Sequence, residues 1–268
     1  MNKLSQLAEA FKSAFVIIVF PVAGFAAYLI FQYVMGNPAN FEGGNNMNQP
    51  LQGNYLGIVY KGGILVVVLI SFAIILFTFV IERFIVISKA SGKLNNKTFV
   101  KEIKKAIAVE DLDKALAICD EHKGAVSNVI RSGILTYKSV ADNNDLIKEQ
   151  KIATIQNDLE EASQLELPSL NNNLIIISTL ASISTLYGLL GTVTGIIKSF
   201  AALARVGAPD AVGLAQGISE ALVTTALGIV IGSFAIIFYN YFTNRIERIT
   251  YAIDECSFSI LHAFTMKK

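Results

Sequence analysis

The chain has 268 residues, of which 53% are hydrophobic and only 16% charged, with a formal net charge of +1. Its mean hydropathy of +0.53 lies far above that of soluble globular domains and favours a polytopic membrane protein. The nearly neutral charge gives no indication of nucleic-acid binding. Cys119 and Cys256 have no metal-binding or redox spacing, so reduced thiols in cytoplasmic segments are expected.

Four apolar runs are long enough to cross a bilayer, which takes roughly 20 apolar residues in a helix. They are residues 13–35, 62–81, 174–197 and 221–244. A cleaved signal peptide is the competing interpretation of the first run. However, this run is long and ends without a clear small-x-small cleavage site, so a retained helix is favoured.

The distribution of lysine and arginine predicts the orientation of these helices. Segments 1–12, 82–173 and 245–268 hold 19 basic residues, whereas segments 36–61 and 198–220 hold three. Both termini and the long segment are therefore expected in the cytoplasm. The other two segments are expected outside, in the periplasm if the cell has one.

The cytoplasmic segment 82–173 is expected to form helices. Residues 97–119 and 126–140 mix apolar and charged positions in the manner of amphipathic helices. Gly124 is a candidate C-cap between them. The run 142–145 is expected to end the second helix and to cap the next one.

Pro168 is expected to mark a kink or a boundary before the third apolar run. The fourth run has no helix breaker before Ser257, so this helix is expected to continue into the cytoplasm to about Phe264. The predicted fold is an all-α polytopic membrane protein with four transmembrane helices and long helical cytoplasmic extensions. No strand-rich or phosphate-loop pattern indicates a soluble enzyme domain.

Small and hydroxyl side chains follow a helical spacing in the third and fourth runs. The hydroxyls that recur every seven residues, on nearly one face of a helix, are Ser178, Thr185, Thr192 and Ser199. The glycines predicted to let helices pack closely are Gly188, Gly191, Gly195, Gly228 and Gly232. These two runs are therefore predicted to pack in an assembly and to offer a weakly polar stripe along a path.

Glu220 opens the fourth run, Thr224 follows one turn later on the same side, and Thr225 points in an adjacent direction. Glu220 is interpreted either as a carboxylate at a pore mouth or as an interfacial residue in contact with lipid headgroups or Lys198. The hydroxyls either line a path or bond their own helix backbone. No acid lies deep in any run, so a proton carrier in mid-membrane would have to come from a partner.

Residues 188–200 and 218–229 resemble the two membrane signatures of the MotA/TolQ/ExbB proton-channel family, and ExbB members most closely. The first matches Gly-hydrophobic-Phe/Leu-Gly-Thr-Val-x-Gly-Ile, and Tyr239-Asn240 matches the inner end of the second. Two features depart from the pattern. Thr185 stands where the family usually has a proline, and the run 13–35 is extra relative to members with three spans.

The resemblance implies an inner-membrane motor subunit driven by the proton motive force. A ring of about five copies would surround a pair of single-span ExbD-like partners that carry the proton-binding aspartate. A TonB-like protein would convey the work to outer-membrane transporters. The resemblance implies Thr192, Glu220 and Thr225 as pore residues, and the hydroxyl pattern adds Thr185 and Thr224. No catalytic, cofactor-binding or metal-binding residue is predicted, and no enzymatic activity is expected.

Other functions remain open at this point. Within the family, a TolQ-like role in envelope maintenance or a MotA-like motility stator is possible, although stators usually carry a larger cytoplasmic torque domain. A structural membrane scaffold would tolerate substitution of Glu220 and of the hydroxyls. A stand-alone solute transporter would usually show inverted repeats or broken span pairs, and none is recognised in this sequence.

Overall fold

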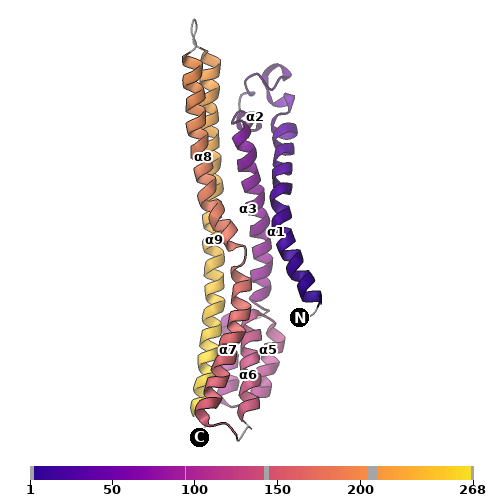
Figure 1. The fold of residues 1–268 in the computed structure, drawn as a ribbon, viewed down its shortest axis with the longest axis vertical. Helices are drawn as coiled ribbons and strands as arrows, with labels where there is room; N and C mark the ends of the chain where they lie inside the picture. Colours follow the sequence, from indigo (N-terminus) through magenta and orange to yellow (C-terminus); the bar gives the residue numbers. More distant parts are fainter. Residues whose placement is uncertain (1–2, 94, 142–144, 205–209, 267–268) are drawn as a thin grey trace. The chain divides into compact units, whose positions relative to one another are not determined.

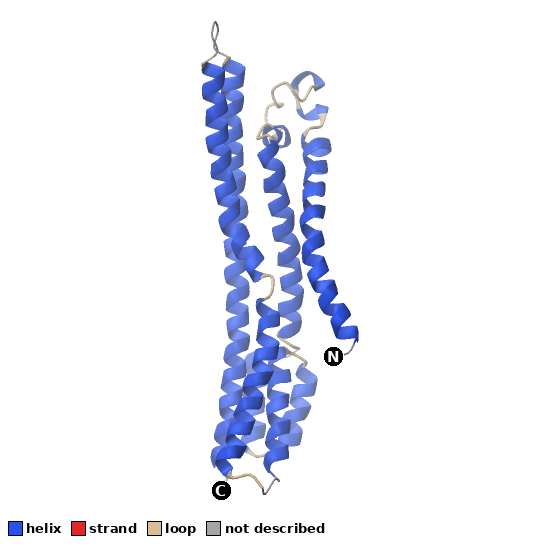
Figure 2. Ribbon diagram, viewed as in Figure 1, coloured by secondary structure: helices blue, strands red, loops and turns tan. Residues whose placement is uncertain are grey.

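The chain forms two compact units of α-helices. A computed structural model describes residues 3–93, 95–141, 145–204 and 210–266, without the side chains of residues 3–14. The described residues contain no β-strand, only an isolated bridge between Phe41 and Pro50 (Figures 1 and 2). The first unit comprises Met1–Val80 and Ile176–Phe238, and the second comprises Ile81–Ile175 and Tyr239–Lys268.

Four helices are long and apolar enough to cross a membrane. The candidate spans are Phe15–Met35, Ile64–Ala90, Lys148–Leu203 and Ala211–Met266. They correspond to α1 (Lys3–Leu29) with its π-helical continuation Ile30–Met35, to α3 (Ile64–Ala90), to α7 (Lys148–Asn171) together with α8 (Leu174–Leu203), and to α9 (Ala211–Met266). This finding confirms the prediction of an all-α fold with four membrane-spanning helices. Pro21 lies inside α1.

Asparagine side chains organise the segment between α1 and α3. The buried Asn40 amide donates to the carbonyls of Val34 and Met35 at 2.8 and 2.9 Å. Its oxygen accepts from the Asn54 amide at 3.0 Å, and Asn54 also caps the short helix α2 (Tyr55–Tyr60). A segment rich in glycine and asparagine therefore has a defined conformation, because its side chains bond backbone groups that no helix pairs.

The helices α8 and α9 extend into the predicted connection 198–220. α8 ends only at Leu203, and α9 begins at Ala211. The Asp210 carboxylate accepts from the Gly213 N–H at 2.9 Å and so caps the start of α9. Residues 205–209, which include Arg205, lie outside the described residues. Residues 198–203 and 211–220 of this predicted connection are therefore helical.

The second unit is built from short amphipathic helices and the later turns of α9. The four short helices are α4 (Asn96–Ala108), α5 (Leu112–His122), α6 (Ala125–Ala141) and α7 (Lys148–Asn171). The predicted helical segment 97–119 is two helices, since Asp111 caps a new start by accepting from Lys114 N–H at 3.0 Å. α9 runs as one helix of 56 residues to Met266, in agreement with the predicted continuation.

Gly124 is not the C-cap that the sequence predicted. The left-handed residue at the end of α5 is Lys123, with φ of 52°. Gly124 is required for a different reason, because a Cβ there would lie 2.7 Å from the Ala90 carbonyl oxygen and 2.9 Å from Gly92. Close approach of two backbones, rather than a turn conformation, therefore explains this glycine.

The predicted cap at residues 142–145 is also wrong. α7 begins at Lys148, and its N-cap is Ile147, whose N–H donates to the Gln150 side chain at 3.2 Å. Residues 142–144 lie outside the described residues. The Gln150 side chain accepts from the N–H of the N-cap residue itself, which is one half of a capping box.

Pro168 lies inside the last turns of α7, and the boundary follows at Asn172 and Asn173. Asn173 adopts φ of 62°, a conformation that asparagine tolerates better than most residues. Its turn leads directly into α8.

The Cys119 thiol is expected to resist alkylation in the native protein. It is buried, and desolvation raises its pKa to about 12, with a smaller effect from Asp120. The thiolate fraction at pH 8 is then on the order of 10⁻⁴. We expect N-ethylmaleimide to modify neither Cys119 nor the buried Cys256 until the chain is unfolded. A Leu165→Cys control, at a site that is 75% exposed, should react at once; equal rates would contradict this account.

Candidate functional site

Glycines bring the backbones of α8 and α9 together in the membrane unit. A Cβ on Gly228 would lie 2.6 Å from the Ser184 carbonyl oxygen and 2.8 Å from the Gly188 Cα. A Cβ on Gly195 would lie 2.5 Å from the Gly217 carbonyl oxygen. No side chain fits in these places, because the neighbouring atoms are backbone and cannot rotate away. The two helices therefore form a close seam, which we call the α8–α9 seam.

The other predicted packing glycines lie in the same seam. Gly191 is buried, and a Cβ there would collide with the Thr224 side chain. A Cβ on Gly232 would lie 2.6 Å from the Thr185 hydroxyl. The seam thus joins two helices of one chain, whereas the sequence alone left open which helices the glycines bring together.

Thr192 and Thr225 meet across the seam. Their hydroxyl oxygens are in hydrogen-bond contact, and both lie beside one backbone carbonyl of α8. Thr225 Oγ1 donates to the Gly188 carbonyl at 3.1 Å, and Thr192 Oγ1 lies 3.4 Å from the same oxygen. Both residues are half-buried. The structure therefore brings together two of the three residues that the family resemblance implied as pore residues.

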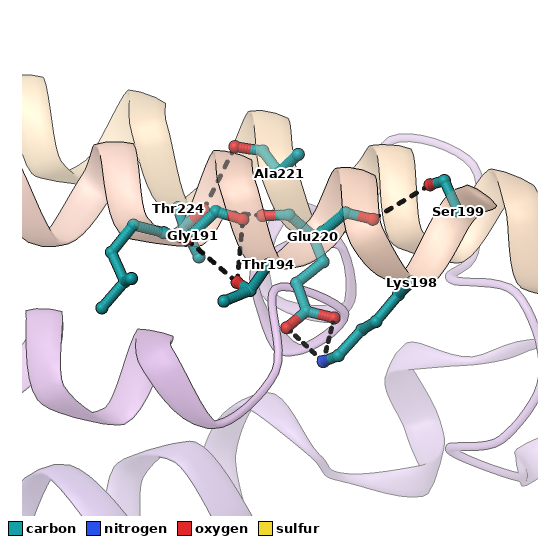
Figure 3. A network of polar contacts seen from close by, with 9 residues as sticks. Gly191, Thr194, Lys198, Ser199, Glu220, Ala221 and Thr224 are labelled. Atoms are coloured by element: carbon teal, nitrogen blue, oxygen red, sulfur yellow. Dashed lines mark hydrogen bonds and ion pairs between the residues drawn. The ribbon is translucent and has the colours of Figure 1, made fainter. Parts of the chain in front are cut away.

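Glu220 forms an ion pair with Lys198 across the same seam, nearer the α8–α9 connection (Figure 3). The Lys198 ammonium donates to both carboxylate oxygens, at 2.6 and 2.7 Å. The Glu220 side chain is only 6% exposed, whereas that of Lys198 is 58% exposed. The predicted contact between Glu220 and Lys198 is therefore confirmed.

Gly63 covers the carboxylate of Glu220 from the turn before α3. It adopts φ of +72°, and a Cβ there would lie 2.9 Å from Glu220 Oε1. Sequence reasoning missed both Gly63 and the importance of Lys198. The doublet Gly62-Gly63 signals a turn, but nothing in the sequence indicates that this turn lies against Glu220.

The remaining hydroxyls bond mainly to backbone groups. Thr224 is fully buried and donates to the Glu220 carbonyl at 2.8 Å (Figure 3). Ser199 bonds its own helix at Gly195 and also the Leu214 carbonyl of α9, at 3.0 and 3.1 Å. Thr185 is exposed, with its hydroxyl 3.4 Å from the Ala181 carbonyl. This is the backbone-bonding alternative for serine and threonine in membrane helices.

The site offers no clear metal chemistry. Over the described residues, no group of three or more histidine, cysteine or acidic side chains is placed to hold a metal ion. Within the seam, the chemically distinctive groups are one buried carboxylate with its lysine and a pair of threonine hydroxyls. Such groups can order water and accept protons in transit, but none of them is an acid in mid-membrane.

Comparison with known proteins places this arrangement in a family. The profile of the MotA/TolQ/ExbB proton channel family matches residues 122–255. The chain is 29% identical over 203 residues to the Tol-Pal system protein TolQ of Haemophilus influenzae, which covers 73% of this chain and 87% of TolQ. It is 42% identical over 86 residues to the putative biopolymer transport protein ExbB-like 3 of Synechocystis sp., covering 31% of this chain and 41% of that protein.

A third relative is the biopolymer transport protein ExbB of Pseudomonas putida, at 35% identity over 86 residues, or 32% of this chain and 26% of that protein. A multi-pass helical membrane protein with a glycine-rich seam is thus the class that fold and site define. The chain belongs to the MotA/TolQ/ExbB proton channel family. The resemblance predicted from residues 188–200 and 218–229 is confirmed.

Proposed function

We propose that this protein is an ExbB-like inner-membrane subunit of a motor driven by the proton motive force. The observation that supports this most directly is the α8–α9 seam, which brings together Thr192 and Thr225 and holds the buried Glu220. This seam lies in the part of the chain that matches the proton channel family. An ExbD-like single-span partner would supply the titrating aspartate, because α8 and α9 hold no acid between Glu220 and Glu247. The output would be TonB-dependent uptake across an outer membrane.

In the proposed assembly, about five copies form a ring around the partner. Because the glycines of the seam are buried between α8 and α9 of one chain, they would hold the two pore helices of each copy close together and would not face the partner. The hydroxyls of Thr185, Thr192 and Thr225, which are exposed or half-buried, would support ordered water near the partner's aspartate. The buried Thr224 would instead brace α9 through its bond to the Glu220 carbonyl. Glu220 would stand at the outer mouth, where Lys198 holds it.

The proposed orientation follows from the basic residues and puts both termini in the cytoplasm. The membrane helices within 13–35, 62–81, 174–197 and 221–244 would then alternate in direction. The segments 36–61 and 198–220 would face the periplasm.

A TolQ-like role in envelope maintenance is the second candidate. The specific observation in its favour is the match to TolQ, which extends over 73% of this chain. A motility stator has less support, since none of the relatives described above is a stator. A structural scaffold predicts that Glu220 and the threonines tolerate substitution.

The mass of the intact complex tests the proposal. The chain is co-expressed with an ExbD-like single-span protein from the same organism, extracted in mild detergent and weighed by native mass spectrometry. We expect several copies of this 29.0 kDa chain together with the small protein, and proton flux only when both are present in liposomes. Changing the small protein's membrane aspartate to asparagine should abolish the flux and leave the mass unchanged. A monomer, or flux from this chain alone, would contradict the proposal.

A further inference from the structure

A basic cavity lies in the second unit. It has a volume of about 680 Å³ and is bounded by the end of α3, the start of α4 and the α9 turns after Tyr239. Four cationic side chains line it: Lys93, Lys97, Arg245 and Arg248. Ser88, Ser91, Asn95 and Tyr251 add hydroxyl and amide groups. A cavity of this composition is suited to an anion that accepts several hydrogen bonds.

The positive charge of this cavity is not neutralised within the described part of the chain. Glu255 is the single carboxylate in the lining, and it already forms an ion pair with Lys104 at 2.6 Å. Over the same residues, none of the four lining cations makes a salt bridge. Like charges around one cavity repel each other, so a bound anion would stabilise the arrangement.

Two further features favour an anion. Helix α4 begins at the cavity, with Asn95 as its N-cap and Asn96 and Lys97 in its first turn. The start of a helix carries a partial positive charge and attracts anions. The Arg245 side chain is held over the Tyr241 ring, 5.7 Å from its centroid, and its Nε donates to the Tyr241 hydroxyl at 3.3 Å.

The basic surface continues along α4. A second cavity of about 620 Å³ shares Lys97, Val100 and Glu255 with the first. Three more lysines line it: Lys101, Lys104 and Lys105. The two linings therefore form one extended basic groove, which is larger than a binding site for a single small ion.

The sequence places this cavity at the membrane surface. Arg245 is the first residue after the apolar run 221–244 and lies three residues beyond Phe242. Since a helix rises about 1.5 Å per residue, Arg245 lies close to the end of this run along the helix axis. Ser88 and Ser91 likewise lie at the end of the apolar helix α3. Arg245 is therefore at the depth of the lipid headgroups, on the side where the basic residues predict the cytoplasm. Basic pockets at that level bind anionic headgroups.

We propose that the cavity lined by Lys93, Lys97, Arg245 and Arg248 binds the phosphate of an anionic phospholipid headgroup in the cytoplasmic leaflet. Arginine guanidinium groups match phosphate oxygens in bidentate geometry, and the lysines add compact positive charge. The inference depends on membrane insertion of the chain, and it does not depend on proton transport. A lipid held here would tie the start of α4 to the inner turns of α9.

The test uses the full-length chain in detergent, stripped of lipid and titrated with dioleoylphosphatidylglycerol or dioleoylphosphatidylcholine. Native mass spectrometry measures binding, and thermal unfolding measures its effect. We expect saturating phosphatidylglycerol to raise Tm by about 5 °C and phosphatidylcholine to have little effect. The variant Arg245→Gln/Arg248→Gln should lose at least about tenfold in affinity. Lys93→Gln/Lys97→Gln should weaken binding in the same direction and serves if the arginine variant fails to fold.

The matched control is Lys89→Gln/Lys114→Gln, which removes two exposed charges that line neither cavity. This control should bind phosphatidylglycerol with the affinity of the unchanged chain. If it loses as much affinity as the arginine variant, the binding is non-specific electrostatic attraction and the proposal is wrong. Glycerol phosphate and inorganic phosphate form a separate arm. If they bind the cavity and the lipid does not, the ligand is a soluble phosphate and the lipid assignment is wrong. All readouts use the chain without its partner, so a failure of proton transport leaves them unaffected.

Discussion

Changing Glu220 to glutamine and Lys198 to methionine together is expected to give a stable protein that supports no proton flux. The two side chains form one ion pair, in which the ammonium donates to both carboxylate oxygens. Removing both charges leaves no unpaired ion in the seam. The carboxylate that the proposed path requires is lost all the same.

The single variants should differ in stability. Lys198→Met leaves a carboxylate that is 6% exposed without its cation, at a cost on the order of 3 kcal/mol. Glu220→Gln leaves an ammonium that is 58% exposed and can turn towards water, so its cost should be much smaller. Thermal unfolding in detergent should therefore rank Lys198→Met as the least stable, with the double variant more stable than it.

Proton flux in liposomes that contain the partner separates the two interpretations of Glu220. If Glu220 serves only to hold Lys198, the double variant should recover flux together with stability. If the carboxylate belongs to the path, Glu220→Gln and the double variant should both lose flux although they fold. Glu42→Gln is the matched control, because Glu42 is an exposed carboxylate in the segment predicted to face the same side. If Glu42→Gln also loses flux, the loss in Glu220→Gln cannot be attributed to a carboxylate in the proton path.

Replacing Gly228 by leucine is expected to prevent the native packing of α8 on α9. Already the first added carbon would lie 2.6 Å from the Ser184 carbonyl oxygen and 2.8 Å from the Gly188 Cα. Because both are backbone atoms, only separation of the helices relieves the overlap. We expect a loss of about 3 kcal/mol and a fall in Tm of roughly 10 °C, together with loss of proton flux.

The control for this substitution is Gly24→Leu in α1. Gly24 lies in another candidate membrane span, and a Cβ there would meet nothing within 4 Å. This variant carries the same change in size and helix propensity, so it should unfold close to the unchanged chain. If both variants unfold alike, the effect reflects leucine in a membrane helix in general, and the close seam has no special importance. Intact flux in Gly228→Leu would contradict the proposal that proton flux requires the close α8–α9 seam.

The interactions within the α8–α9 seam required the tertiary structure. Thr192 and Thr225 were both candidate residues, but their direct contact joins positions 33 residues apart. Glu220 was recognised as unusual because a carboxylate at a membrane boundary needs a partner. Lys198 was one of several possible contacts, and the crossing of the helices selected it. Gly63 was missed because its role depends on where the turn before α3 lies.

Local signals in the second unit were less reliable. Gly124 was expected to end a helix, yet Lys123 takes the left-handed conformation and Gly124 serves a close backbone approach. The aspartates near residue 145 were expected to cap α7, yet Gln150 bonds the N-cap instead. Several residues can satisfy the same free N–H or carbonyl group, so a sequence alone does not show which one does.

The sequence by itself determined the class of this protein: four apolar helices, a long continuous final helix and the family to which it belongs. These properties depend on the length of the apolar runs and on the spacing of nearby residues, and both follow directly from the order of residues in the sequence. Only the tertiary structure decided that the glycines join α8 to α9, that Lys198 neutralises Glu220 and that basic side chains from α4, α9 and the turn before α4 surround one cavity. Such contacts arise between residues far apart in sequence, and they depend on how the helices cross.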